Sequence, residues 1–206
     1  MQDLNTRIYD GDLPDDFECG QSVAIDTETM GLHLQRDRLC LVQLSTGDGA
    51  ATLVRIGKGQ HAAPNLARML GDPGILKIFH FGRFDIAVLN SAFGVMARPA
   101  YCTKIASKLA RTYTDQHGLK VLTRELLGIE LEKEQQSSDW GAASLTESQV
   151  RYAAHDVIHL HRLRDALDAM LEREQRKELA DACFAFLPER VRLDMAGWSG
   201  RDIFAH

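Results

Sequence analysis

A short apolar run ends in two acidic residues in Ser22-Val-Ala-Ile-Asp26-Thr-Glu28. The apolar positions predict a buried β-strand. Asp26 and Glu28 are two positions apart, so a strand presents both carboxylates on one face. Two half-buried carboxylates repel each other, and a divalent cation relieves that repulsion. The stretch therefore predicts a strand that ends at a metal site, and a plain polar strand end entering a loop is the alternative.

The segments that follow this strand predict a mixed sheet with helices packed on both faces, in the α/β class. Gly47-Asp-Gly49 predicts a hairpin and hence an antiparallel start to the sheet. Further strands are expected at residues 39–45, 51–56, 75–80 and 101–103. Helices are expected at residues 64–70, 83–93 and 104–111, and almost throughout from residue 118, apart from a loop at 132–143. Apolar residues at helical spacing predict one long helix over residues 146–173, which a Ser or Thr can cap.

Length and composition indicate one globular domain of 206 residues, with a core at about 20–175 and a helical, aromatic tail at about 176–206. The net charge of −5 argues against a protein that grips a long duplex and favours a short substrate. The four cysteines are far apart and are expected to be reduced thiols rather than disulfide or zinc ligands. No apolar run suffices for a membrane span, and the start shows no secretory signal, so a cytoplasmic protein is expected.

Two later segments add carboxylates. Asp85 follows the strand expected at 75–80, at the edge where sites form in open α/β sheets, although an Asp in the first turn is also a common partner of the helix dipole. Tyr152 and Asp156 are four positions apart and share a helix face. A core Tyr beside a surface Asp is the alternative here. No single motif is decisive, and the order of the three carries the inference.

Taken together, the chain resembles the DEDD exonuclease superfamily, in its tyrosine-bearing, RNase D-like subgroup. The motifs are Ile25-Asp26-Thr27-Glu28-Thr29-Met30-Gly31-Leu32, His80-Phe-Gly-Arg-Phe-Asp85 and Tyr152-Ala-Ala-His-Asp156, with Ser137-Ser-Asp-Trp140 and Thr103-Lys104 as further similarity. The resemblance implies an RNase H-like fold. The stand-alone length, the Gln135–Trp140 run and the tail after Trp198 resemble the NrnC-type nano-RNases of alphaproteobacteria. One departure is Phe81, where many superfamily members carry Asn.

The resemblance also implies a set of site residues. Asp26, Glu28, Asp85 and Asp156 would hold two divalent cations, Mg²⁺ or Mn²⁺, about 4 Å apart. Tyr152 would orient the attacking water, because a free phenol is a poor base at neutral pH. Substrate contacts are expected from Thr27, Met30, Gly31, Leu32, His80, Lys104, Ser138 and Trp140. The alternatives are a simple loop leucine for Leu32, a buried structural histidine for His80, and packing that anchors the loop for Trp140. A solvated face is the alternative to a phosphate-binding patch of Lys104, Lys108 and Arg111.

The implied function is 3′→5′ hydrolysis of short single-stranded RNA, including dinucleotides, to nucleoside 5′-monophosphates by a homo-oligomeric ring. A broader RNase D-like exonuclease, which trims structured RNA such as tRNA precursors or degrades DNA, is the alternative. A non-catalytic binding module is disfavoured because all four carboxylates are present. Zinc binding by His155 and His159 is disfavoured because the HExxH pattern is missing. The aromatic tail either packs on its own domain or forms a subunit interface.

Overall fold

The computed structural model describes residues 5–34, 36–131 and 138–206. Its centre is a six-stranded mixed sheet in the order β1-β4-β3-β2-β5-β6. The antiparallel strands β2 (Ser22–Thr29), β3 (Leu39–Ser45) and β4 (Ala51–Arg55) confirm the expected start of the fold. The shorter strands β5 (Leu76–Phe79) and β6 (Ala100–Cys102) continue the sheet in parallel from β2.

One strand was not expected from the sequence. β1 (Thr6–Asp10) pairs in parallel with β4 at the outer edge of the sheet. Its side chains are exposed or half-buried, and Ile8 is 46% exposed. An edge strand with two solvated faces lacks the apolar signal by which buried strands are recognised.

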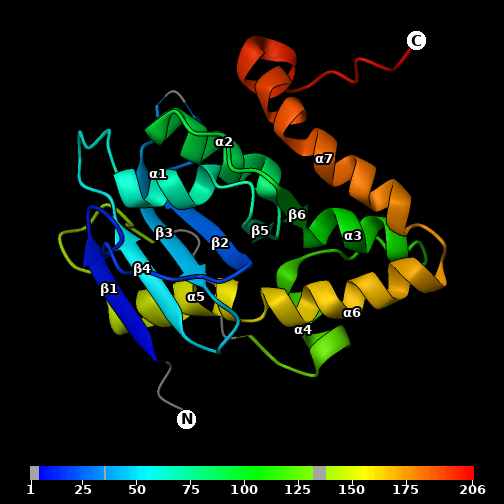
Figure 1. The fold of residues 1–206 in the computed structure, drawn as a ribbon, viewed down its shortest axis with the longest axis horizontal. Helices are drawn as coiled ribbons and strands as arrows, with labels where there is room; N and C mark the ends of the chain where they lie inside the picture. Colours follow the sequence, from blue (N-terminus) through cyan, green and yellow to red (C-terminus); the bar gives the residue numbers. More distant parts are fainter. Residues whose placement is uncertain (1–4, 35, 132–137) are drawn as a thin grey trace.

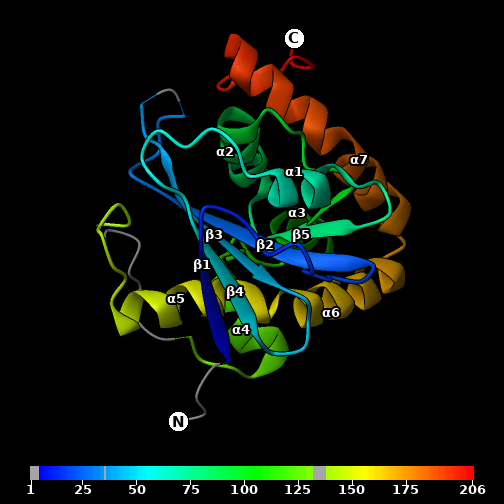
Figure 2. The ribbon, with the colours of Figure 1, turned by 60° about the vertical axis from the view of Figure 1, so that its left-hand side comes forward.

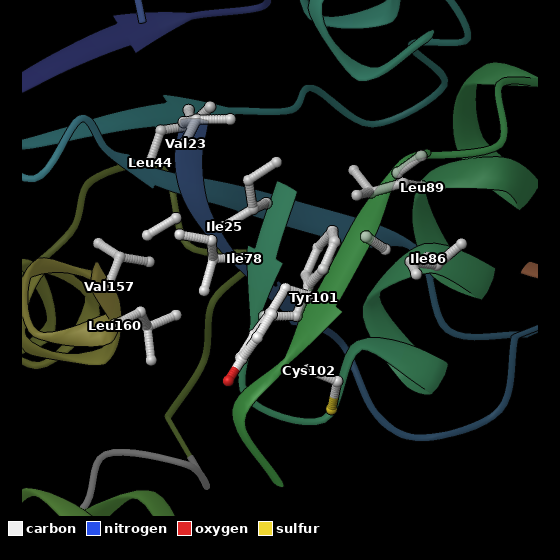
Figure 3. Packing of buried hydrophobic residues seen from close by; sticks show 14 of the residues in the cluster. Val23, Ile25, Leu44, Ile78, Ile86, Leu89, Tyr101, Cys102, Val157 and Leu160 are labelled. Carbon is white, nitrogen blue, oxygen red and sulfur yellow. The ribbon is translucent and has the colours of Figure 1, made fainter. Parts of the chain in front are cut away.

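Helices cover both faces of the sheet, as Figures 1 and 2 show, and this confirms the predicted α/β class. On one face lie α1 (Pro64–Gly71) and α2 (Gly82–Phe93). On the other lie α5 (Glu147–Ile158) and α6 (Leu160–Arg173), with α3 (Thr103–Ala110) and α4 (Leu119–Leu127) packed against α6. Figure 3 shows the resulting core, in which Ile86 and Leu89 of α2 lie on one side of Ile25 and Val157 and Leu160 lie on the other.

The single helix predicted over residues 146–173 is two helices in the structure. The expected cap at its start is present, because Thr146 and Gln149 form a capping box. His159, with φ −100° and ψ −8°, separates α5 from α6. The break lets α5 pack on β2, β3 and β4 while α6 packs on α3 and β5. Apolar spacing continues across the break, so the sequence pattern did not reveal it.

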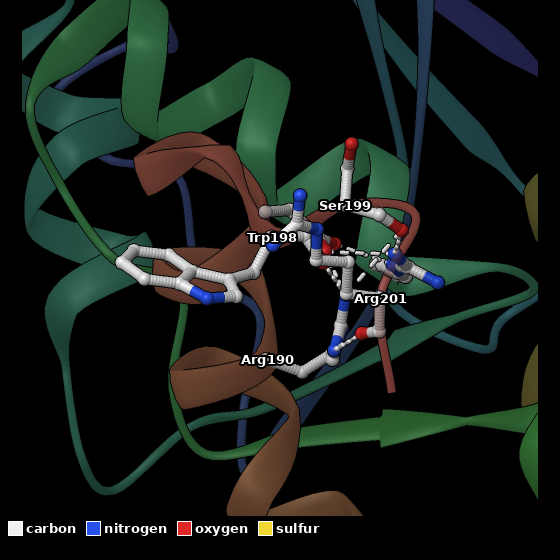
Figure 4. A network of polar contacts seen from close by, with 6 residues as sticks. Arg190, Trp198, Ser199 and Arg201 are labelled. Carbon is white, nitrogen blue, oxygen red and sulfur yellow. Dashed lines mark hydrogen bonds and ion pairs between the residues drawn. The ribbon is translucent and has the colours of Figure 1, made fainter. Parts of the chain in front are cut away.

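The tail was expected either to pack on its own domain or to form a subunit interface, and the C-terminal segment has both buried and exposed apolar residues. Phe184 and Leu187 of α7 (Lys177–Leu193) are buried, whereas Trp198, Ile203 and Phe204 beyond it are exposed. A short π-helical turn, η1 (Asp194–Trp198), follows α7. Its Asp194 forms an ion pair with Arg83 of α2 and another with Arg190 of α7. Figure 4 shows Arg190 in this network, where its guanidinium also donates to the backbone oxygens of Trp198 and Arg201.

All four cysteines are free, as predicted. None of the helices in the described ranges combines the length and apolar character that a membrane crossing requires. Residues 1–4 lie outside the described part of the chain, and so does much of the loop predicted at 132–143.

Candidate active site

The end of β2 supplies the first two carboxylates. Val23, Ile25 and Thr27 are buried, and the alternation of the strand turns Asp26 and Glu28 to the opposite face, toward α5. There the two carboxylates meet Asp156 of α5. Single carboxylate oxygens of the three residues lie within 4.8 Å of one another, and the group is suited to a metal ion.

Asp85 approaches the cluster from α2. It is 4% exposed, and its Oδ1 accepts a hydrogen bond of 2.7 Å from the Thr27 hydroxyl. Because Thr27 faces away from Asp26 on the strand, Asp85 reaches the site around the end of β2 and is not part of the closest group of three. It lines the same cavity, and after burial its charge is the largest influence on the pKa of Asp26. The structure thus brings all four predicted carboxylates to one pocket.

Burial and mutual repulsion dominate the electrostatics of this pocket. Burial, followed by the charges of Asp85, Asp156 and Glu28, raises the pKa of Asp26 well above its usual value. Burial, with Asp156 and Asp85, raises the pKa of Glu28 to about 9, and burial raises the pKa of Asp85 to about 7. Among the described residues, no lysine or arginine contributes to these three shifts. Such a cluster has the oxygen ligands and the uncompensated charge that a hard divalent cation requires.

Tyr152 lies one helical turn before Asp156, on the same face of α5. Burial, and then the charges of Asp156, Glu28 and Asp26, raise the pKa of its phenol. The hydroxyl is therefore protonated at neutral pH, and a hydrogen bond that it donates to Asp156 is among the causes of its raised pKa. Trp140 packs against the Tyr152 ring with the centroids 6.0 Å apart, and it is only 4% exposed. Of the two alternatives for Trp140, base stacking and packing, the structure has packing.

The carboxylates lie in a cavity of about 740 Å³. Of the predicted substrate contacts, the cavity wall includes Thr27, Gly31, Leu32, His80 and Lys104. Leu32 is 81% exposed, as a residue that contacts a substrate base requires. Its loop needs glycine at position 31, because a side chain there would collide with the Asp37 carboxylate, which accepts the His33 N–H at 3.0 Å. Met30, Ser138 and Trp140 do not form part of the wall.

His80 is held in a defined orientation at the end of β5. Its Nδ1 lies 2.9 Å from the Thr103 hydroxyl, which itself donates to the Phe79 backbone oxygen. Burial, and then the charge of Lys104, lowers the pKa of His80 to about 3, so the ring is neutral. A hydrogen bond to the His117 backbone is a further contact of the ring and acts to raise its pKa.

The sequence did not single out several members of the wall. Phe84, Lys120 and His155 line the cavity, and so does Phe81, which had been noted only as a departure from the superfamily pattern. Phe81 is 48% exposed, and the Lys104 ammonium lies 4.4 Å from its ring centroid. The signal for Phe81 was its position directly after the strand that ends at His80.

The proposed basic face of Lys104, Lys108 and Arg111 does not exist as a unit. Arg111 is fully buried, where it pairs with Glu125 and donates to the Gln116 backbone oxygen at 2.8 Å. Helical spacing alone did not reveal this, because Arg111 follows the last residue of α3 and a charged side chain with several partners can lie inside. A second cavity, of about 940 Å³ between β6, α6 and α7, is larger than the first. It contains none of the four carboxylates, and the smaller cavity is therefore the candidate site.

Comparison with known proteins agrees with this geometry. The model of a family described as 3′-5′ exonuclease matches residues 12–172. The chain belongs to this family. Brucella melitensis NrnC is 56% identical in sequence, with a TM-score of 0.95 over 98% of both chains. Structures of that protein bound to pGG and with bound Mg²⁺ are 54% identical, with TM-scores of 0.95 and 0.94. They cover 99% and 98% of this chain and 100% of theirs. The chain is thus an NrnC-type member of the RNase D-like exonucleases.

More distant members of the family are longer. Ribonuclease D of Gluconacetobacter diazotrophicus is 35% identical over 167 residues, which are 81% of this chain and 42% of that protein. Escherichia coli RNase D, described as an exoribonuclease involved in structured RNA processing, is 26% identical. Its TM-score is 0.74 over 88% of this chain and 50% of its own. The chain therefore spans about half or less of the length of these relatives.

Proposed function

We propose that the chain hydrolyses short single-stranded oligoribonucleotides, including dinucleotides, from their 3′ ends and releases nucleoside 5′-monophosphates. The observation that carries the proposal is the carboxylate cluster of Asp26, Glu28 and Asp156 within a cavity of about 740 Å³. Asp85 completes the charge of this cavity from the α2 side. A phosphodiester is itself an anion, so this pocket accepts one only together with cations.

Asp26, Glu28, Asp85 and Asp156 would hold two divalent cations, Mg²⁺ or Mn²⁺. The fit rests on their all-oxygen ligands and on raised pKa values without a basic partner among the described residues. When bound, such cations supply Lewis-acid activation of water and neutralise charge on the phosphate. That Brucella NrnC has a structure with bound Mg²⁺ supports this choice of ion.

Tyr152 would act through its proton. Its pKa is raised by burial and by the carboxylates around it, so the phenol does not serve as a base near neutral pH. It would donate a hydrogen bond that fixes the attacking water or a phosphate oxygen. Leu32 would insert against the terminal bases, and His80 would contact the terminal sugar. Lys104 and Lys120 in the same wall would contact phosphates.

The preference for short RNA rests on the charge and size of the molecule. The net charge of −5 provides no basic track for a long strand, and the lysines of the cavity wall are Lys104 and Lys120. The structure of Brucella NrnC bound to pGG supports a substrate of this length. Steady-state hydrolysis of 5′-labelled RNAs of two to ten nucleotides would test the proposal. We expect kcat/KM to be highest for the dinucleotide; values equal to or rising with length would refute the preference.

The alternative is a broader exonuclease that trims structured RNA or degrades DNA, and it is supported by the relatives named ribonuclease D. The same assay would include a tRNA precursor with a 3′ extension and a DNA series of matched sequence. Preferential trimming of the precursor would establish this alternative.

We also propose that the chain forms a homo-oligomeric ring through its C-terminal segment, in the cytoplasm. Trp198, Ile203 and Phe204 are 44%, 44% and 80% exposed, a concentration of apolar side chains that assembly would bury. Light scattering coupled to gel filtration would give the mass. The paired change Trp198→Ser and Phe204→Ser should lower the mass of the assembly, and a monomeric wild-type protein would refute the ring.

A further inference from the structure

Tyr152 rests on a small cluster of buried side chains that is separate from the main core. Trp140 is its largest member, with its ring tilted by 41° to that of Tyr152 at 6.0 Å. The other buried members come from β3, β4 and α5: Cys40, Leu41, Leu53 and Ala153. The cluster therefore connects the Tyr152 ring to the sheet that carries Asp26 and Glu28.

The backbone on either side of Trp140 is fixed by contacts to other elements. Gln149 of α5 donates its side-chain amide to the Asp139 backbone oxygen at 3.2 Å. Arg55, at the end of β4, donates to the Ala143 backbone oxygen at 2.7 Å. With both flanks held, the indole has a defined position between β4 and α5.

The position of Trp140 relative to the cavity indicates what it does. Tyr152 lines the cavity and Trp140 does not, so the indole lies against the part of the Tyr152 ring that faces away from the carboxylates. The oxygen of a tyrosine hydroxyl lies on the Cβ–Cγ axis, so rotation about the Cα–Cβ bond is the side-chain rotation that displaces it. An empty space beside the ring would let it turn and withdraw the hydroxyl from Asp156, Glu28 and Asp26.

We propose that Trp140 is a positioning residue, which holds the Tyr152 hydroxyl over the carboxylate cluster and does not itself contact the substrate. The inference rests on the role proposed above for Tyr152. It assigns Trp140 a task in the rate of the chemical step rather than in substrate binding.

A double-mutant cycle tests this assignment. We would measure kcat and KM for Trp140→Leu, Tyr152→Phe and the double variant, with a 5′-labelled RNA dinucleotide and heptamer in saturating Mg²⁺. Trp140→Leu should lower kcat by about 10- to 100-fold, the usual effect of a misplaced catalytic group, and leave KM nearly unchanged. In the Tyr152→Phe background the same change should have no further effect on kcat, because the hydroxyl that it positions is gone.

The conservative change Trp140→Phe should recover most of the rate. The Trp140 Nε1 is buried and makes no hydrogen bond within the described part of the chain. Phenylalanine therefore keeps an aromatic ring at this position, and the substitution removes no hydrogen bond of the indole. Phe184→Leu is the matched control. Phe184 is 5% exposed and packs on another tyrosine ring, that of Tyr101, at 4.3 Å, outside the carboxylate cavity. The substitution Phe184→Leu should lower thermal stability with little change in kcat.

Three outcomes would overturn the inference. The first is that Trp140→Leu lowers kcat by the same factor with and without the Tyr152 hydroxyl. The second is that Trp140→Leu changes KM and leaves kcat unchanged. The third is that Phe184→Leu lowers kcat as much as Trp140→Leu does. The single variant Tyr152→Phe separates a failure of the role proposed for Tyr152 from a failure of the role inferred for Trp140. If it retains full kcat, the proposed role of Tyr152 fails and the inference fails with it. If it loses kcat while Trp140→Leu does not, only the inference on Trp140 fails.

Discussion

Asp26 is the residue on which the repulsion in the cavity concentrates, since burial and three carboxylates raise its pKa. Asp26→Asn should therefore have two opposite effects. Hydrolysis should fall at least about 100-fold, because cation-assisted charge stabilisation contributes several kcal/mol. Thermal stability in EDTA should rise, because one repelling charge is gone. RNA hydrolysis and melting temperature measure the two effects. Asp16→Asn, at an exposed site, is the control that should change neither.

Phe81 has an exposed aromatic ring in the wall of a cavity that also contains many polar groups. The ring lies beside the Lys104 ammonium. Phe81→Asn removes a surface for base stacking, which contributes about 1–3 kcal/mol per base, and a cation–π contact of about 0.5–1 kcal/mol. We expect KM for a dinucleotide to rise about 10-fold or more. Ile8→Asn makes the same kind of change at a site of similar exposure on β1, and a comparable rise there would contradict the assignment.

At the scale of elements, one carboxylate is shared by two arginines in the link between α2 and the C-terminal segment, where Arg83 also donates to the Ser199 backbone oxygen at 2.7 Å. Asp194 accepts from Arg83 of α2 at 2.7 Å and from Arg190 of α7 at 2.6 Å, and its side chain is 9% exposed. Asp194→Asn leaves two arginines without their counter-charge and should reduce the free energy of unfolding by about 2 kcal/mol. Urea denaturation would measure this. Glu189→Gln, which breaks an exposed pair with Arg192, should cost less than about 1 kcal/mol.

The elements that the sequence predicted correctly have apolar residues that are buried in the core, as in β2, β5, α2 and the start of α5. Of the elements in the structure, β2, α2 and α5 carry the four carboxylates. β1 was missed because neither of its faces is buried. The break at His159 was missed because packing on two different partners, rather than a local signal, causes it. Arg111 was placed on a surface although it is buried, since its ion-pair partner Glu125 lies in another element, α4. For Trp140 the sequence left base stacking and packing open, because the residues that surround it come from β3, β4 and α5.

At the scale of the whole molecule, the cavity makes stability depend on pH and on cations. The pKa of Glu28 rises from 4.5 to about 9 on folding and that of Asp85 from 3.8 to about 7. The folded state therefore binds these protons more tightly than the unfolded state, and stability falls as pH rises through this interval. Because both pKa values are raised in the folded state, we expect the melting temperature in EDTA to decline between pH 5 and pH 9.

Mg²⁺ should reverse this trend, because it binds the deprotonated carboxylates of the folded state. Melting curves at pH 5, 7 and 9, with EDTA or with Mg²⁺, would show the largest cation-dependent rise at pH 9. A rise of equal size at pH 5 would contradict the link between the shifted pKa values and the cation. Asp26→Asn should reduce the difference between the two conditions, while Asp16→Asn should preserve it.

The carboxylates of β2 come from the first strands of the sheet and Asp156 comes from α5, with the parallel pairing of β2 and β5 between them. Such non-local contacts form late in folding. A chain that is still being translated has no complete cluster before α5 has left the ribosome. The cluster, and with it any hydrolysis that it supports, is therefore complete only after Asp156 has been synthesised and α5 has packed on the sheet.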